Sequence, residues 1–218
     1  MNKTDFLDYF HGGLFALILI LLASAWVDAA NAGDHDGYIV MGQSNAAGMI
    51  NASGLDTKLN ARIIGCAKNG QLMDAFEPDY FNLSIYGDCF NKIKTWQANG
   101  GIIKGVIFWQ GESDASYKFG YDGLPIADHW TQKFYRLFNA LNSDIGCHVP
   151  WVLVDLNDFY NHSDLVYWGR MRYYQRHTQH ADVTHIDSSP YPFLTDDKHL
   201  TPVGYDQIGT DIANMFLH

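Results

Sequence analysis

Residues 38–45 read Tyr-Ile-Val-Met-Gly-Gln-Ser-Asn, so four apolar or aromatic residues run directly into a turn that contains a glycine. Such a run predicts a buried strand, and the turn would present Ser44 at the end of that strand. A serine hydroxyl is a weak nucleophile near neutral pH, so a reactive serine needs a base and donors that stabilise an oxyanion. Taken alone, the turn is more often only structural.

Four further runs of apolar or β-branched residues follow, at 61–67, 105–109, 151–154 and 183–186. They are nearly continuous rather than alternating, as expected for strands that are covered on both faces. Apolar residues in 126–141 fall on one helical stripe, 167–181 is a second expected helix, and Thr201-Pro202 predicts the start of a third. Alternating strands and helices predict an α/β fold with a parallel, doubly wound sheet.

Ligands of such a sheet bind beyond the carboxyl ends of its strands. The polar candidates are expected at this rim: Ser44 after the first strand, Gly70 after the second, Gln110 and Glu112 after the third, and His199 before the last helix. Independent placements at one rim argue more strongly for a site than any single motif does.

Asp196 lies three residues before His199. At this spacing its carboxylate can turn back to bind Nδ1–H of the histidine and leave Nε2 facing a serine. Asp197 is the alternative partner, and a solvated loop that caps the last helix is the alternative without chemistry.

Four motifs carry a resemblance to a known family, in this order: Gly42-Gln43-Ser44-Asn45, Trp109-Gln110-Gly111-Glu112-Ser113-Asp114, Trp168-x-x-Met171-Arg172-x-x-Gln175 and Asp196-x-x-His199. They resemble the sialate O-acetylesterase and acetylxylan esterase family (carbohydrate esterase family six) of the SGNH hydrolases. The resemblance implies a flavodoxin-like three-layer α/β/α sandwich with a central parallel sheet. It also implies Ser44 as the nucleophile, His199 as the general base and Asp196 as the group that orients the base.

The same resemblance implies an oxyanion hole made by the backbone N–H groups of Ser44 and Gly70 and the side-chain amide of Gln110. Here Asn69-Gly70-Gln71 stands where the family commonly has Gly-Gly-Ser or Gly-Gly-Thr. The broader superfamily has an asparagine at the position of Gln110, so the alternative is that Gln110 holds Glu112 or the serine loop.

Glu112 and Asp114 are expected to support the site from behind or to form the turn, and a direct catalytic part for Glu112 is the alternative. Arg172 and Gln175 are expected to stabilise their helix and its contacts rather than to touch substrate.

These residues together predict a serine esterase that hydrolyses O-acetyl groups of a carbohydrate, such as sialic acid, xylan or another polysaccharide, through an acetyl-serine intermediate. The mechanism needs no metal and no organic cofactor. A histidine base works only when neutral, so activity is expected to fall below about pH 6–7. The alternatives are a catalytically weak or inactive carbohydrate-binding or surface-decoration module on the same scaffold and a lipase- or thioesterase-like enzyme.

Composition limits the partners. A chain of 218 residues suits one catalytic domain, here 33–218, and 47% hydrophobic residues exclude a disordered chain. The expected partner is an acetylated glycan. A net charge of −10 argues against nucleic acid, whose phosphates need a basic surface. The oligomeric state is left open.

The N-terminal segment 1–32 is expected to be a cleaved secretory signal, failing that an uncleaved membrane anchor, and failing both an amphipathic or buried helix of the folded protein. No charged residue occurs in 12–27, and the apolar run 14–22 has the length of a signal core but is short of the roughly 20 residues of a membrane span. Ala30-Asn31-Ala32 has the small-x-small form of a cleavage site. The expected location is secreted, periplasmic or cell-surface, with membrane contact only through this segment if it is retained.

Three cysteines, Cys66, Cys89 and Cys147, fit an exported protein with one disulfide and one leftover thiol. Proximity in the sequence favours the pair Cys66–Cys89, which would contribute about 3 kcal/mol by loop closure. Three buried, reduced cysteines are the alternative.

Overall fold

A computed structural model describes residues 35–78, 85–116, 124–158 and 165–218. The chain divides into two units, Met1–His35 and Asp36–His218, and the sheet belongs to the second. The predicted signal or anchor at 1–32 lies outside the described residues. Within the described ranges, no helix combines the length and the apolar character needed to cross a membrane.

The described part of the second unit contains a five-stranded sheet in which every pairing is parallel. Its strands, in the spatial order β2-β1-β3-β4-β5, are β2 (Arg62–Ala67), β1 (Asp36–Gly42), β3 (Ile102–Trp109), β4 (Trp151–Asp155) and β5 (Val183–Asp187). All five predicted strands are present, and the predicted parallel α/β sheet is confirmed. The strand order reverses direction between β1 and β3, where a doubly wound sheet binds its ligands.

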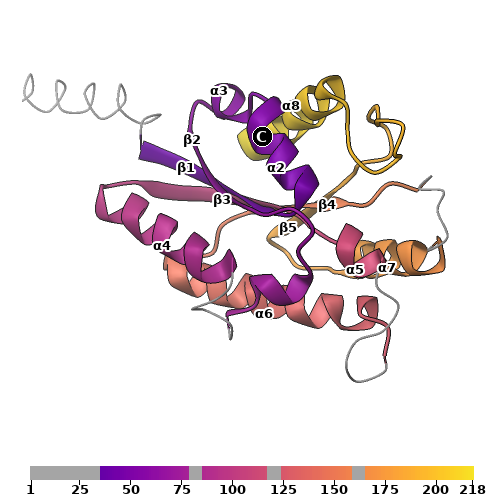
Figure 1. Ribbon diagram of the computed structural model, residues 1–218. Coiled ribbons are helices and arrows are strands. Elements are labelled where there is room, and N and C mark those ends of the chain that lie inside the picture. Colours follow the sequence, from indigo (N-terminus) through magenta and orange to yellow (C-terminus); the bar gives the residue numbers. More distant parts are fainter. Residues whose placement is uncertain (1–34, 79–84, 117–123, 159–164) are drawn as a thin grey trace, which may run out of the picture. The chain divides into compact units, whose positions relative to one another are not determined.

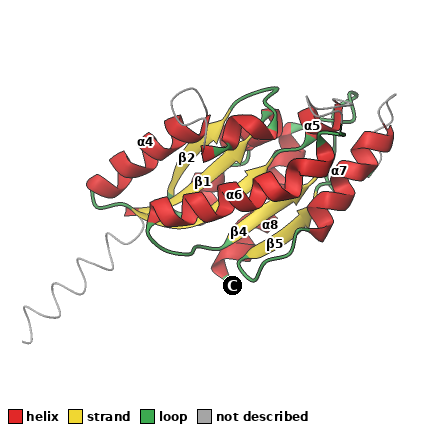
Figure 2. Cartoon of the chain, turned by 90° about the horizontal axis from the view of Figure 1, so that it is seen from below, coloured by secondary structure: helices red, strands yellow, loops and turns green. Residues whose placement is uncertain are grey.

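Helices cover both faces of the sheet and make a flavodoxin-like three-layer sandwich (Figure 1). One face carries α2 (Ser44–Ala52), α3 (Leu55–Leu59) and α8 (Pro202–Leu217). The other carries α4 (Ile85–Ala98), α6 (Ala127–Ile145) and α7 (Leu165–His177), which Figure 2 shows lying across the strands. Two short helices, η1 (Met73–Phe76) and α5 (Glu112–Ser116), follow β2 and β3 in the chain.

The stripe predicted for α6 is the side that packs on the sheet. Trp130, Phe134, Leu137, Phe138 and Leu141 are all fully buried. The rings of Trp130 and Phe134 stack at 5.4 Å, and Phe134 meets Phe108 of β3 at 5.7 Å. Burying side chains of this size contributes about 1.5–3 kcal/mol each, so α6 is a main anchor of its layer.

The ends of α6 and α7 differ from the prediction: α6 extends to Ile145 rather than Leu141, and α7 begins at Leu165 rather than Tyr167. The helix expected over 167–181 ends at His177, because the chain turns there toward β5 and the carbonyl of Thr178 accepts a hydrogen bond from His185 Nε2 at 2.8 Å. The predicted start of α8 is confirmed: the Thr201 hydroxyl accepts the N–H of Gly204 at 3.1 Å, and Pro202 is the first helical residue.

A disulfide joins Cys66 of β2 to Cys89 of α4, with the two Cα atoms 5.3 Å apart. The predicted pairing is therefore confirmed. Cys147 is exposed and free, which rules out the alternative of three buried thiols.

Replacing both bridged cysteines, as Cys66→Ser with Cys89→Ser, is expected to lower the free energy of unfolding by about 3 kcal/mol, because the unfolded chain loses a cross-link. Urea denaturation measures the change. Cys147→Ser serves as the control and should leave stability unaltered. Equal stability of the double variant and the wild type would contradict the expectation.

Candidate active site

The serine turn, residues 42–44, lies against the carboxyl end of β3. Gly42 has φ +143°, and a Cβ there would lie 1.9 Å from the carbonyl oxygen of Trp109, so only glycine fits. The next residue, Gln43, donates its N–H to the same oxygen at 3.1 Å. As a result β1 passes into α2 within one residue, and Ser44 becomes the first residue of that helix.

A hydrogen-bonded series connects the serine to a carboxylate. Ser44 Oγ lies 2.8 Å from Nε2 of His199, and Nδ1 of the same ring lies 2.6 Å from Oδ2 of Asp196. The other oxygen of Asp196 accepts the backbone N–H groups of Lys198 and His199, both at 3.0 Å. Partial burial raises the pKa of Asp196, but the hydrogen bonds from His199 and Lys198 outweigh it and lower the pKa to about 2. The carboxylate is therefore charged at neutral and mildly acidic pH.

Asp197, the alternative partner, is used by the backbone of the loop. It adopts a left-handed conformation with φ +51°, and its carbonyl accepts the side-chain N–H of Asn157 at 2.8 Å. The geometry thus places the carboxylate of Asp196, and not that of Asp197, on the ring of His199.

Glu112 holds the residues on both sides of Ser44. It is fully buried at the start of α5, where one carboxylate oxygen accepts Nε2–H of Gln43 and the other accepts Nδ2–H of Asn45 at 2.7 Å. Burial raises the pKa of Glu112, while these two amides and the charge of Lys198 act in the opposite direction. The prediction that Glu112 supports the site from behind agrees with these contacts.

Asn45 joins the two loops of the site. Its Nδ2 donates to the backbone carbonyl of Lys198 at 2.9 Å as well as to Glu112, and its Oδ1 accepts the hydroxyl of Tyr205 at 2.8 Å. No role was predicted from the sequence for Asn45 or Gln43. The sequence feature that could have indicated a role is that two amide residues flank the candidate nucleophile. In the structure Gln43 and Asn45 are both 1% exposed.

Two of the three predicted oxyanion donors lie at the rim with their N–H groups available. Ser44 is the first residue of α2, and N–H groups of a first helical turn have no acceptor within the helix and lie at the positive end of its dipole. Gly70 follows β2, whose Ala67 is in register with Gly42, so the two loops begin side by side. No described residue accepts a hydrogen bond from the N–H of Gly70.

The prediction that the side-chain amide of Gln110 is the third oxyanion donor is wrong. Its side chain is fully buried, and Oε1 accepts the indole N–H of Trp130 at 2.6 Å. The amide nitrogen donates to Asp114 Oδ2 and to the carbonyl of Gln71 at 3.3 Å. Because both amide hydrogens have acceptors inside the protein, Gln110 has none left for an oxyanion. The alternative role was also wrong, since the side chain of Gln110 holds Asp114 and the Gly70 loop rather than Glu112 or the serine loop.

Asp114 extends this support. Its two oxygens accept the backbone N–H of Met73 at 3.2 and 3.1 Å, so the loop that carries Gly70 is fixed just beyond Gln71. Burial raises the pKa of Asp114 to about 7, although the Gln110 amide, the Met73 N–H and the nearby Lys133 favour the charged form.

Gln175 of α7 fixes the ends of two strands, as expected for a residue that stabilises helix contacts. Its Oε1 accepts the N–H of Leu156 after β4 at 3.0 Å, and its Nε2 donates to the carbonyl of Gln110 after β3 at 2.9 Å.

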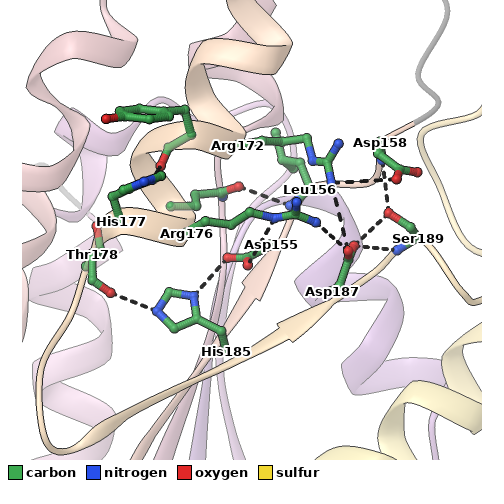
Figure 3. Close-up of polar contacts among 12 residues, drawn as sticks. Asp155, Leu156, Asp158, Arg172, Arg176, His177, Thr178, His185, Asp187 and Ser189 are labelled. Carbon is green, nitrogen blue, oxygen red and sulfur yellow. Dashed lines mark hydrogen bonds and ion pairs between the residues drawn. The ribbon is translucent and has the colours of Figure 1, made fainter.

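A charged cluster ties the same helix to β4 and β5 (Figure 3). Arg176 pairs with Asp187, and Arg172 lies 3.8 Å from the same carboxylate. His185 of β5 places Nδ1 3.1 Å from Asp155 Oδ1 and Nε2 2.8 Å from the carbonyl of Thr178. Both ring nitrogens face acceptors, and the hydrogen bond with Asp155 is the main reason that the pKa of His185 is raised, against the effect of burial.

We expect His185→Gln to destabilise the fold more at low pH than at high pH. A pKa that is higher in the folded state contributes stability fully below the unfolded value of about 6.5, and this contribution is lost as pH rises through the folded value. Melting temperatures at about pH 5.5 and pH 8.5 test the sign. His177→Gln, at an exposed ring that contacts the carbonyl of Tyr173, is the matched control. A deficit of equal size at both pH values would show that the charge of His185 does not matter.

A carboxylate, an imidazole and a serine hydroxyl connected in this order are the arrangement found in serine hydrolases, here at the rim of a flavodoxin-like sheet. The model of the family described as carbohydrate esterase, sialic acid-specific acetylesterase matches residues 55–218. The chain belongs to this family, which confirms the resemblance and supports carbohydrate acetylesterase activity. The matched part includes Glu112, Asp196 and His199 and begins after Ser44.

Solved structures share the fold at low sequence identity. A protein from Arabidopsis thaliana has a TM-score of 0.68 and 18% identity, over 84% of this chain and 98% of its own. A carbohydrate acetylesterase from Xanthomonas citri has a TM-score of 0.52 and 17% identity, and the match covers 77% of this chain and 39% of that protein. A third structure is a carbohydrate esterase family 2 enzyme with a carbohydrate-binding domain, from Corynascus thermopiles (Myceliophthora fergusii). It has a TM-score of 0.56 and 14% identity, and the match covers 84% of this chain and 65% of that protein. The search of curated proteins gave no match.

Proposed function

We propose that this protein removes O-acetyl groups from a carbohydrate, with Ser44 as the nucleophile, His199 as the general base and Asp196 as the group that orients the imidazole. The observation that carries the proposal is the unbroken hydrogen-bond series from Asp196 through His199 to Ser44, in a chain of a carbohydrate esterase family. Acetylated sialic acid, xylan and other acetylated polysaccharides are the candidate substrates.

In the first half of the reaction, Ser44 Oγ forms a bond to the acetyl carbonyl carbon while its proton passes to Nε2 of His199. The charged Asp196 stabilises the imidazolium that results. Collapse of the tetrahedral intermediate breaks the bond between the carbonyl carbon and the sugar oxygen, and that oxygen takes the proton from Nε2. The sugar leaves with a free hydroxyl, and the acetyl group stays on Ser44.

Water completes the cycle. His199 takes a proton from a water molecule, whose oxygen attacks the acetyl-serine, and then returns the proton to Ser44 Oγ as acetate leaves. In both halves the negative oxygen would be stabilised by the N–H groups of Ser44 and Gly70, the first of which has the added field of the α2 N-terminus. Gln110 contributes indirectly by holding the loop that carries Gly70.

The test is acetate release from O-acetylated sialic acids, acetylated xylan oligosaccharides and other acetylated sugars, together with mass spectrometry of peptides from acid-quenched enzyme. We expect acetate release from at least one sugar class and an acetyl group on the peptide that contains Ser44. Preference for octanoyl over acetyl esters would favour a lipase-like enzyme. A wild type inactive on every ester would favour a carbohydrate-binding module.

A further inference from the structure

A groove separate from the serine site lies between the edge strand β2 and helix α4. It has a volume of about 540 Å³, within the range of small-molecule sites. Its walls come from β2, from α4 and from the residue that follows α4: Arg62, Ile63, Ile64, Gly65, Asn91, Lys92, Thr95, Trp96 and Asn99. Because the strands are parallel and the serine turn follows the carboxyl end of β1, the groove lies toward the opposite end of the sheet.

The chemistry of these walls is that of a sugar site. Trp96 supplies an aromatic surface, while Asn91, Asn99 and Thr95 supply amide and hydroxyl groups that can bond to sugar hydroxyls. The indole lies close against two glycines, since a Cβ on Gly101 would lie 2.2 Å from its Nε1 and one on Gly37 would lie 2.7 Å away. Two residues without side chains thus make room for the ring of Trp96.

The groove carries positive charge. Arg62 and Lys92 are exposed, and no carboxylate is among the lining residues. Neither cation forms an ion pair with any residue that the structure describes, although the chain carries a net charge of −10. Two unpaired cations beside an aromatic ring and amides complement a sugar that carries a carboxylate.

A peptide strand is the other occupant that a sheet edge can take. Here Lys92 Nζ donates to the carbonyl of Gly65 at 2.6 Å and so occupies an edge acceptor that an added strand would need. We propose that this groove is a second glycan-binding site, which holds a carboxylate-bearing sugar of the polymer or glycan on which the enzyme acts. The role of this site in holding substrate rests on the proposed carbohydrate esterase function, but the binding itself can be tested without any ester.

The test is an NMR titration of the ¹⁵N-labelled full chain with unacetylated saccharides, at low and high salt. The acidic ligands are sialyl-lactose, a galacturonic acid trisaccharide and a glucuronic-acid-substituted xylan oligosaccharide, and lactose and xylotriose are the neutral controls. We expect at least one acidic ligand to shift the signals of Gly65 and of the Trp96 indole, more weakly at high salt and more strongly than its neutral control.

Arg62→Gln and Arg62→Gln with Lys92→Gln should weaken binding of the acidic ligand, by about 1.5- to 5-fold for each charge removed. Lys94→Gln is the matched control, since Lys94 lies on the same helix but does not line the groove. Two-dimensional spectra report whether each variant is folded.

Three results would overturn the proposal: no groove shifts with any acidic saccharide, shifts confined to Ser44 and Gly70, or tighter binding of an acidic peptide than of every sugar. Because none of the ligands carries an ester, failure here leaves the acetate-release test untouched. An inactive enzyme that binds acidic sugars in the groove would instead reject the esterase function and retain the site.

Discussion

Replacing Ser44 by alanine is expected to lower kcat for p-nitrophenyl acetate by about a thousandfold or more, because Ser44 is the only described residue whose hydroxyl is hydrogen-bonded to Nε2 of His199. The backbone of α2 should be unchanged, since the hydroxyl of Ser44 is hydrogen-bonded only to His199 among the described residues. Steady-state kinetics, with circular dichroism as a check on folding, measure the effect.

Ser53 provides the matched control. It follows α2, and its buried hydroxyl donates to the carbonyl of Met49 at 2.6 Å, so Ser53→Ala removes a serine hydroxyl from the same region without touching the rim. This variant should lose some stability and keep its kcat. If Ser44→Ala retains activity comparable with that of Ser53→Ala, Ser44 is not the nucleophile.

Glu112→Ala is expected to have the second-largest effect on kcat. Glu112 would act by positioning Ser44 through Gln43 and Asn45 rather than by taking part in the reaction. The substitution would remove the acceptor of Gln43 Nε2–H and one of the two acceptors of the Asn45 amide, at about 1–3 kcal/mol for each N–H left unsatisfied. Displacement of the serine turn by about 1 Å would lower kcat about 100-fold. Since no substrate contact is removed, KM should change much less than kcat.

Glu112→Gln separates position from charge. Glutamine keeps the shape and one acceptor, and a rotated Gln43 amide can meet its new N–H groups, because Gln43 Oε1 has no partner among the described residues. We therefore expect Glu112→Gln to recover most of the kcat lost in Glu112→Ala. Glu77→Ala, which removes another buried carboxylate that is ion-paired with Arg136, should cost stability without lowering kcat below the melting temperature. Wild-type kcat in folded Glu112→Ala would contradict a positioning role.

The sheet could be predicted because its strands are read from local composition. Each strand is a short apolar run, and the covered faces of a parallel sheet leave no alternation to confuse the pattern. Helices α2 and α4 were not predicted, because their contacts depend on distant elements. In α2, for example, Gly48 lies against the ring of Tyr205 from α8, a neighbour that no local pattern indicates.

In the site, Ser44 and His199 could be predicted to lie together because ligands of a parallel sheet bind beyond the carboxyl ends of its strands. The three-residue spacing of Asp196 and His199 was enough to predict their contact. The role of Gln110 could not be read from the sequence, because its partners Trp130 and Asp114 approach from different helices. The same holds for Asn45, whose contact with the carbonyl of Lys198 joins residues far apart in the chain. Hydrogen-bond partners of a buried amide are a property of packing rather than of order along the chain.

The placement of the imidazole just before α8 also has a consequence for biosynthesis. A ribosome makes the turn with Ser44 long before it makes the loop with Asp196 and His199. Nascent chains that stop anywhere before residue 199 carry Ser44 without the ring that would take its proton. Chains that stop before His199 should therefore not hydrolyse esters, so the esterase activity of the purified protein would report only chains that extend beyond His199.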